Sequence, residues 1–176
     1  MEAFVGFLLI LFGIAMAIGF EQILGGKPIA APIREGLGWP VQAAALLAAS
    51  YGASVIFSMP RSLLWASVLS SLVSWVVTML GARAFPGHVV AFAAALALGL
   101  FANLCARMTK RPAQLFQLPG LSLLVPGSFG FLSLEAFLRG EFLGGAAKGF
   151  QMILIAGALV TGTLLANVLL PAKKIL

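Results

Sequence analysis

The chain has 176 residues, of which 61% are apolar and only 9% are charged, and its mean hydropathy is +1.09. A soluble domain of this length carries roughly a quarter charged residues, so the composition excludes a protein whose main surroundings are water. The formal net charge of +6 would suit a nucleic-acid partner, but the Lys and Arg residues stand singly between apolar stretches, with one cluster over 107–111. Loops of membrane proteins favour such residues, so no nucleic acid is expected as a partner.

Six charge-free stretches follow one another along the chain: Ala3–Phe20, Gly36–Pro60, Ser62–Ala82, Ala84–Ala106, Pro112–Leu134 and Gly149–Ala172. Each stretch is close to or above the about 20 residues that a helix needs to cross the hydrocarbon of a bilayer. We therefore predict an all-α fold, a polytopic membrane helix bundle of about six hydrophobic segments in a lipid bilayer.

The turn-forming residues between these stretches set the expected helix limits. We predict helices over 3–24, 40–58, 61–82, 87–106 and 145–170, and an interrupted fifth segment over 112–138. The stretch before the first helix has no basic region, so we expect a retained helix and not a cleaved signal. The chain is then a single integral membrane domain over 1–176, in which 1–39 adds a helix and a Pro/Gly linker to a core at 40–171.

The basic residues give an orientation. If all six segments cross, six Lys and Arg residues lie on the side of both termini and five lie opposite. The cluster of Arg107, Lys110 and Arg111 is the clearest asymmetry, and cytoplasmic loops carry such an excess. We predict that both termini face the cytoplasm.

The stretch QLPGLSLLVPGSFG, residues 117–130, holds two Pro-Gly pairs inside an otherwise apolar segment. We call Pro119-Gly120 the first pair and Pro126-Gly127 the second pair. Each proline removes one helical hydrogen bond and disfavours helical angles at the residue before it, and glycine lowers the remaining resistance to unwinding. The pattern predicts a helix broken by both pairs, with a short half before Leu118, an unwound middle, and a second half over 127–138.

A broken helix inside a membrane points to a binding site. Irregular backbone is tolerated at that depth only where protein or water satisfies it, and discontinuous helices of transporters bring bare helix ends to a substrate. The N-terminus of the second half would offer free N–H groups to an anionic group such as a carboxylate. The candidate substrate pathway therefore comprises Pro119, Gly120, Ser122, Pro126, Gly127 and Ser128.

Three other polar residues are secondary candidates for this pathway. Gln117 borders the break and would satisfy freed carbonyls, while Asn103 lies within the fourth segment. Glu135 is an acid near a span, but Arg139 follows four residues later, which favours an ion pair. With a single His88 and a single Cys105, the chain is not expected to hold a metal or another cofactor.

A stripe of small hydroxyl residues runs along the third segment. Ser67, Ser71, Ser74 and Thr78 recur at spacings of four, three and four, which is one face of a helix. Such residues can line a pathway or let two helices pack closely. We favour the second interpretation, with Ala45, Ala49 and Gly52 of the second segment as the opposing stripe.

The residues RPAQLFQLPGLSLLVPGSFGF resemble the signature of the threonine/serine exporter family, in its C-terminal half or its separate small subunit of the YjjB type. YGASVIFSMPRSLLW (51–65) and GALVTGTLLAN (157–167) are similar to two further segments of that family. The resemblance covers roughly 40–171. Leu123 and Ser58 depart from it, since the family often has proline and asparagine at these positions.

The resemblance implies a membrane transport subunit that exports threonine, serine or related small carboxylates across a bacterial inner membrane. Because the larger half of the family's transporter is absent, it also implies a larger partner subunit, a homo-oligomer, or both. A non-catalytic assembly subunit stays open as an alternative. An intramembrane enzyme is disfavoured, because Gly127-Ser128-Phe129-Gly130 is not a serine nucleophile turn and His88 would have to act without an orienting acid.

Overall fold

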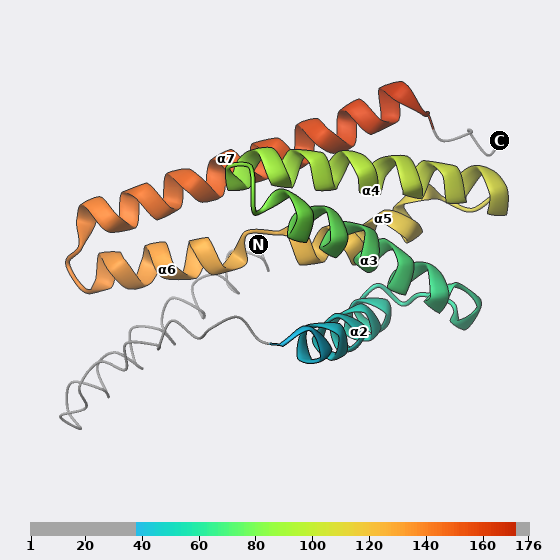
Figure 1. Cartoon of the computed structure of the whole chain (residues 1–176), viewed down its shortest axis with the longest axis horizontal. Coiled ribbons are helices and arrows are strands. Elements are labelled where there is room, and N and C mark those ends of the chain that lie inside the picture. Colours follow the sequence, from blue (N-terminus) through green and yellow to red (C-terminus); the bar gives the residue numbers. More distant parts are fainter. Residues whose placement is uncertain (1–37, 172–176) are drawn as a thin grey trace. The chain divides into compact units, whose positions relative to one another are not determined.

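The computed structural model describes residues 38–171, and every regular element in that part of the chain is a helix (Figure 1). In chain order these are α2 (Trp39–Ile56), η1 (Arg61–Leu63), α3 (Leu64–Gly81), α4 (Gly87–Thr109), α5 (Ala113–Leu124), α6 (Gly127–Leu138) and α7 (Phe142–Leu169). The all-α prediction is confirmed for these residues. The predicted helix at 3–24 and the linker up to Leu37 lie outside them.

Four stretches within the described residues are long and apolar enough to cross a membrane: Arg61–Gly81, Gly87–Thr109, Ala113–Leu138 and Phe142–Leu169. The third of these combines α5 and α6. Helix α2 is also apolar but shorter, at Pro40–Ile56. A set of six crossing segments is therefore not established, because the first lies outside the described residues and the second is this short helix.

The chain forms two compact units, whose boundary passes between Pro126 and Gly127 and again between Met152 and Ile153. The larger unit contains α2 to α5 together with the second part of α7. The described residues of the smaller unit are α6 and the first part of α7.

Helices α3, α4 and α5 pack against one another in the larger unit, and α2 packs against α3 and α5. Small side chains make this packing close. Helix α4 shows it most clearly, because Ala94, Ala95 and Ala102 have no exposed surface and Leu98 is enclosed with them. Without a bulky side chain between the helix axes, neighbouring backbones approach each other, which is how helices associate in lipid.

Two residues in left-handed backbone conformation end helices of the larger unit. Ser58 has a φ of 50° and follows α2, and Lys110 has a φ of 55° and follows α4. In both places a proline comes two residues later, so the residue between them is disfavoured in a helix. Helix α2 therefore ends at Ile56, and α4 continues to Thr109, three residues beyond its predicted limit.

The second part of α7 packs against α4 through small residues. A Cβ added to Gly99 would lie 2.5 Å from the Cβ of Ala166, and one added to Gly162 would lie 2.6 Å from the carbonyl oxygen of Phe92. At both places hydrogen is the largest substituent that fits. The glycines of the last segment thus serve helix packing here.

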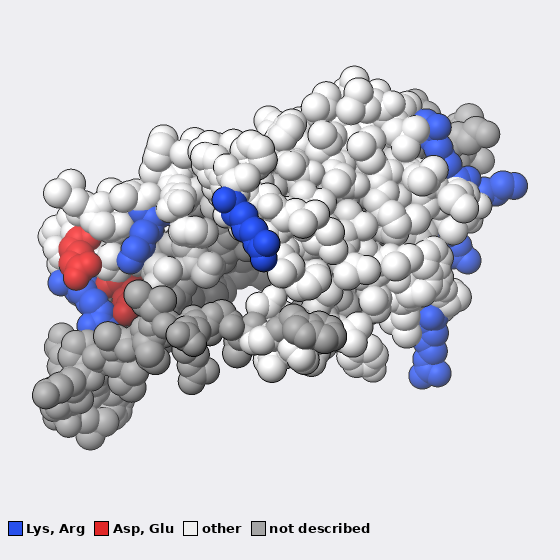
Figure 2. Space-filling view, in the orientation of Figure 1, with Lys and Arg blue, Asp and Glu red and all other residues white. Residues whose placement is uncertain are grey.

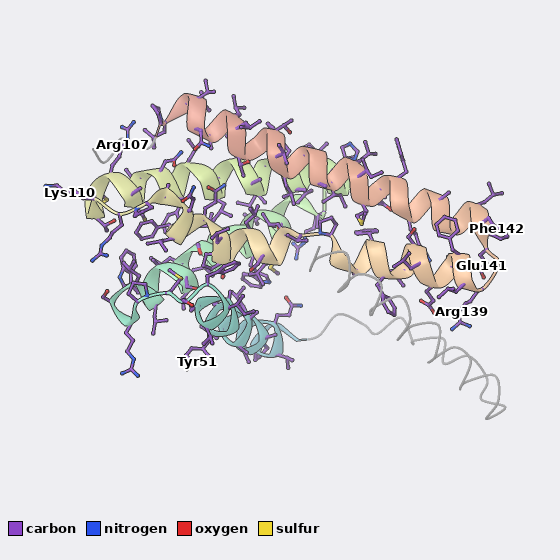
Figure 3. All side chains as sticks on the ribbon, turned by 180° about the vertical axis from the view of Figure 1, so that it is seen from behind. Tyr51, Arg107, Lys110, Arg139, Glu141 and Phe142 are labelled. Carbon is purple, nitrogen blue, oxygen red and sulfur yellow. The ribbon has the colours of Figure 1, made fainter. Side chains whose placement is uncertain are left out.

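In the smaller unit, α6 and the beginning of α7 form a helical hairpin. Gly140, with a φ of 83°, lies in the turn, and Figure 3 shows Arg139, Glu141 and Phe142 around it. The Ser133 hydroxyl donates a hydrogen bond of 2.7 Å to the Gly145 carbonyl. Helix α7 begins at Phe142, three residues before the predicted start at 145, so Gly144 and Gly145 lie inside it.

Replacing Gly99 by alanine should force α4 and α7 apart, because the new methyl group would lie 2.5 Å from that of Ala166. We expect a loss of stability of about 1–3 kcal/mol, which is typical of overpacking. The double variant Gly99→Ala/Ala166→Gly moves the methyl group to the other helix and should recover most of this loss. Unfolding in detergent micelles, followed by tryptophan fluorescence, measures both effects.

Gly157→Ala is the matched control, because a Cβ at this α7 position meets nothing within 4 Å. A double variant that is no more stable than Gly99→Ala alone would contradict the close contact between the two helices.

Candidate functional site

The two Pro-Gly pairs have different surroundings. The first pair lies inside α5, which is helical from Ala113 to Leu124, and both of its residues are buried. The expectation of an unwound middle from Leu118 onward is therefore wrong for this pair. A proline within a membrane helix removes one hydrogen bond, but neighbouring helices and local adjustments can compensate for the loss.

Gly120 marks the place where three helices meet. A Cβ at this position would lie 2.6 Å from the Ser70 carbonyl oxygen, 2.7 Å from Leu98 Cδ1 and 2.8 Å from Ser74 Oγ. Ser70 and Ser74 belong to α3 and Leu98 belongs to α4. The glycine is required because the backbone of α5 lies directly against its neighbours, and not because the helix unwinds.

A seam of buried serines runs along α3 on the side of this contact. Ser67, Ser70, Ser71 and Ser74 have no exposed surface. The Ser67 hydroxyl donates to the Ser50 carbonyl of α2 over 2.9 Å. The predicted helix–helix seam agrees with this geometry at Ser67, Ser71 and Ser74, but Ser70 was not predicted and Thr78 is exposed. On α2 the buried residues are Ser50 and Ser54, whereas the predicted Ala45 and Ala49 are exposed.

Two hydroxyl groups of the seam, and that of Ser54 on α2, are satisfied within their own helix. Ser70 donates to the Ser67 carbonyl over 2.9 Å, Ser74 to that of Ser70 over 3.1 Å, and Ser54 to that of Ser50 over 2.8 Å. Ser71 differs, because its Oγ is buried and has no hydrogen-bond partner among the described residues. Local bonding keeps the seam stable in an apolar interior, since an unpaired buried hydroxyl costs about 1–3 kcal/mol.

The second Pro-Gly pair lies between two helices. Helix α5 ends at Leu124, Val125 is extended with a ψ of 125°, and α6 begins at Gly127. Gly127 and Ser128 are exposed, and a Cβ at Gly127 would meet nothing within 4 Å. Among the described residues, Gly127 is therefore not required for close helix packing, unlike Gly120.

Ser122 lies between the two pairs, and its hydroxyl group donates to the Pro119 carbonyl over 2.7 Å. In a regular helix this carbonyl would accept from the backbone four residues later. The side chain thus supports the last turn of α5 before the chain leaves the helix.

The secondary candidates are divided between the two units, with Gln117 and Asn103 in the larger unit and Glu135 in the smaller one. Gln117 is half-buried in regular helix, so there is no break beside it for its side chain to satisfy. Glu135 forms the expected ion pair with Arg139, at 3.1 Å. Asn103 is fully buried and donates from Nδ2 to Asn167 Oδ1 over 2.8 Å, which joins α4 to α7.

The partnership with Asn167 was not predicted, because no spacing rule connects residues on segments so far apart in the chain. The Asn103 Oδ1 atom is buried without a hydrogen-bond partner in the described part of the chain. Residues 38–171 contain no group of three His, Cys, Asp or Glu side chains that could hold a metal ion.

Comparison with known proteins gives one match. Residues 42–169, which are more than half of the chain, match the model of the family described as Threonine/Serine exporter, ThrE. This range agrees closely with the region of resemblance predicted at 40–171. No curated protein and no solved structure matched the chain.

The two glycines of the Pro-Gly pairs should respond differently to the same substitution. Gly120→Ala brings a Cβ to 2.6 Å from a backbone oxygen, whereas Gly127→Ala meets nothing within 4 Å. We expect Gly120→Ala to lower the free energy of unfolding by about 1–3 kcal/mol and Gly127→Ala to leave it unchanged or slightly raised. Detergent unfolding of the two variants side by side measures the difference, and equal losses in both would show that Gly120 is not a packing contact.

Proposed function

We propose a function from one premise, which is that the chain belongs to the threonine/serine exporter family. That family indicates membrane transport, and with four helical stretches able to cross a bilayer the chain is a multi-pass membrane protein. The proposed activity is export of threonine, serine or related small carboxylates across a bacterial inner membrane. The chain acts as one subunit, together with a larger partner subunit of the same family or with further copies of itself.

The observation that carries this proposal is the interruption at the second Pro-Gly pair. Helix α5 starts directly after the basic loop at Lys110 and has 12 residues, so it is about 18 Å long at 1.5 Å per residue. The hydrocarbon of a bilayer is about 30 Å thick. A helix of this length that starts at the membrane surface supports an interruption near the middle of the bilayer, where transporters bind their substrates.

Charge complementarity suggests how a substrate binds there. The first N–H groups of α6 have no partner within the helix, and the positive end of the helix dipole favours an anion. In the proposed site the substrate carboxylate accepts hydrogen bonds from the backbone at Gly127 and Ser128. The Ser128 hydroxyl group adds a further donor.

The remaining candidate residues take supporting roles in this proposal. Pro119 and Gly120 hold α5 against α3 and α4, so they fix the place where the interruption occurs. Ser122 supports the last turn of α5. Gln117, Asn103 and Glu135 are not needed to bind the substrate in this scheme.

An efflux experiment tests the second pair directly. Pro126→Ala/Gly127→Ala returns a backbone donor and improves helix propensity, so α5 and α6 should merge into one helix. We expect export of threonine from loaded cells, with the partner subunit co-expressed, to fall about tenfold or more. A hydrogen bond to a charged group is worth about 1.5–3 kcal/mol, so losing one such bond already accounts for that fall.

Pro86→Ala/Gly87→Ala is the matched control, because this pair also stands at the start of a helix and a Cβ at Gly87 also meets nothing within 4 Å. Export is normalised to the amount of protein inserted in the membrane. Full export by the Pro126/Gly127 variant would exclude the proposed site. The chain would be an assembly subunit if it restored assembly of the partner subunit but the assembled partner exported threonine without it.

A further inference from the structure

One end of the larger unit carries several positive charges and no negative charge. The described residues of the whole larger unit contain Arg61, Arg83, Arg107, Lys110 and Arg111 but no Asp or Glu, and all of these cations except Arg83 lie at this end. Figure 2 shows Lys and Arg side chains projecting from this end, and Figure 3 labels Arg107 and Lys110 there.

A buried apolar cluster shows which of these cations lie together. Met59 and Leu63, on either side of Arg61, pack with Cys105 and Ala106, which directly precede Arg107. Phe116, from the first turns of α5, completes the contact. The start of η1, the end of α4 and the start of α5 therefore meet, and Arg61 belongs to the same end as the 107–111 cluster. Arg83 lies beyond the far end of α3.

Arg107 has a structural role at this end. Its Nε and Nη2 atoms donate to the Pro171 carbonyl over 3.0 and 2.7 Å, just after the end of α7. A cation placed here binds a carbonyl left free at a helix C-terminus and opposes the negative end of the helix dipole. Arg61, Lys110 and Arg111 have no such role, since they are exposed and make no ion pair within the described part of the chain.

The helix dipole does not explain the position of Arg61. This residue begins a helical stretch that runs from Arg61 to Gly81, and the positive end of a helix dipole disfavours a cation. Among the described residues, no acidic side chain pairs with its exposed guanidinium. Lys110 and Arg111 follow α4, so its helix dipole favours their positive charges. They nevertheless add to the positive charge that no described acidic residue balances at this end of the larger unit.

An exposed tryptophan indicates the depth of this end in the membrane. Trp65 lies one turn after Arg61, has 48% of its surface exposed and packs against the ring of Phe116 with centroids 6.5 Å apart. Tryptophan concentrates at the boundary between hydrocarbon and headgroups. We therefore expect the three cations, which lie at the same end of the unit as Trp65, to be at the level of the lipid phosphates.

We propose that Arg61, Lys110 and Arg111 form a binding surface for the headgroups of anionic phospholipids. The occupant is a lipid phosphate carried by a negatively charged headgroup such as phosphatidylglycerol. A zwitterionic lipid offers the same phosphate, but its own ammonium group cancels the attraction. Each basic residue near such a surface contributes up to about fivefold in affinity.

Quenching of Trp65 by brominated lipids tests this surface in the intact chain. In a Trp39→Phe/Trp75→Phe background, Trp65 reports the lipids beside the three cations. The chain is placed in bilayers of phosphatidylcholine with a fixed share of brominated phosphatidylglycerol or of brominated phosphatidylcholine. We expect the anionic lipid to quench Trp65 severalfold more efficiently, and Arg61→Gln/Lys110→Gln/Arg111→Gln to remove this preference.

The matched comparison is Arg61→Gln against Arg83→Gln, because both remove one exposed arginine from an end of α3. Arg61→Gln should lower the preference by up to about fivefold, and Arg83→Gln should leave it unchanged. The proposal would be overturned if the two lipids quenched Trp65 equally in the protein that keeps all three cations. It would also be overturned if Arg61→Gln and Arg83→Gln changed the lipid preference equally. Salt should weaken the preference, because screening acts on exposed charges.

Native mass spectrometry of the chain with all its tryptophans provides a second measurement. Released from mixed-lipid bilayers, it should retain phosphatidylglycerol in preference to phosphatidylcholine, and the triple glutamine variant should not. If inorganic phosphate displaces the retained lipid at millimolar concentration, the surface recognises free phosphate and the lipid assignment is wrong.

Discussion

The contact between Gly120 of α5 and the Ser70 carbonyl of α3 is the constraint on which the packing of the larger unit depends. A Cβ at Gly120 would lie within 2.8 Å of three atoms on two helices, so the three axes are as close as a glycine permits. The side chains of α3 that face this contact are small, and they are serines. A serine hydroxyl group can bond to a carbonyl of its own helix. Hence the seam is polar in composition and still stable in a surrounding without water.

The two Pro-Gly pairs show that one dipeptide can have two physical uses. At Pro119-Gly120, neighbouring helices enclose the backbone and hold it helical despite the lost hydrogen bond. At Pro126-Gly127, a Cβ on the glycine would meet no described residue within 4 Å, so no packing among the described residues opposes the intrinsic tendency of the pair to end a helix. The surroundings of each pair, and not its own chemistry, determine which outcome occurs. The proposed substrate site therefore depends on the second pair, with the first pair fixing its position.

The charges of the larger unit complement this arrangement. Arg107 holds the end of α7 against the end of α4, and the three free cations are proposed to hold the same end at the lipid phosphates. Helix α5 starts at that end. A fixed depth for its first residue also fixes the depth at which it is interrupted, about 18 Å further along. The proposed anchoring at the surface and the proposed binding near the midplane are thus linked by the length of one helix.

The sequence was sufficient for those features that depend on composition and local chemistry. Charge-free stretches of membrane length gave the all-α fold and most helix limits, because hydrocarbon tolerates only internally bonded backbone. The four-residue spacing of Glu135 and Arg139 gave their ion pair, and the double Pro-Gly stretch gave the family. Each of these signals lies within a short segment and needs no knowledge of neighbouring helices.

The tertiary structure determined those features that depend on which helices contact one another. The helical state of the first pair follows from the approach of α3 and α4 to Gly120, and no local rule contains that approach. The same holds for Ser50 facing Ser67 and for Asn103 facing Asn167, since helical spacing defines a face but does not name its partner. That Arg61 lies at the same end as the 107–111 cluster is likewise visible only from the buried apolar cluster that the neighbouring residues share. The sequence determined the helices and their faces. Contacts between distant segments determined which faces pack as the serine seam, which are linked by the hydrogen bond between Asn103 and Asn167, and which form the charged surface.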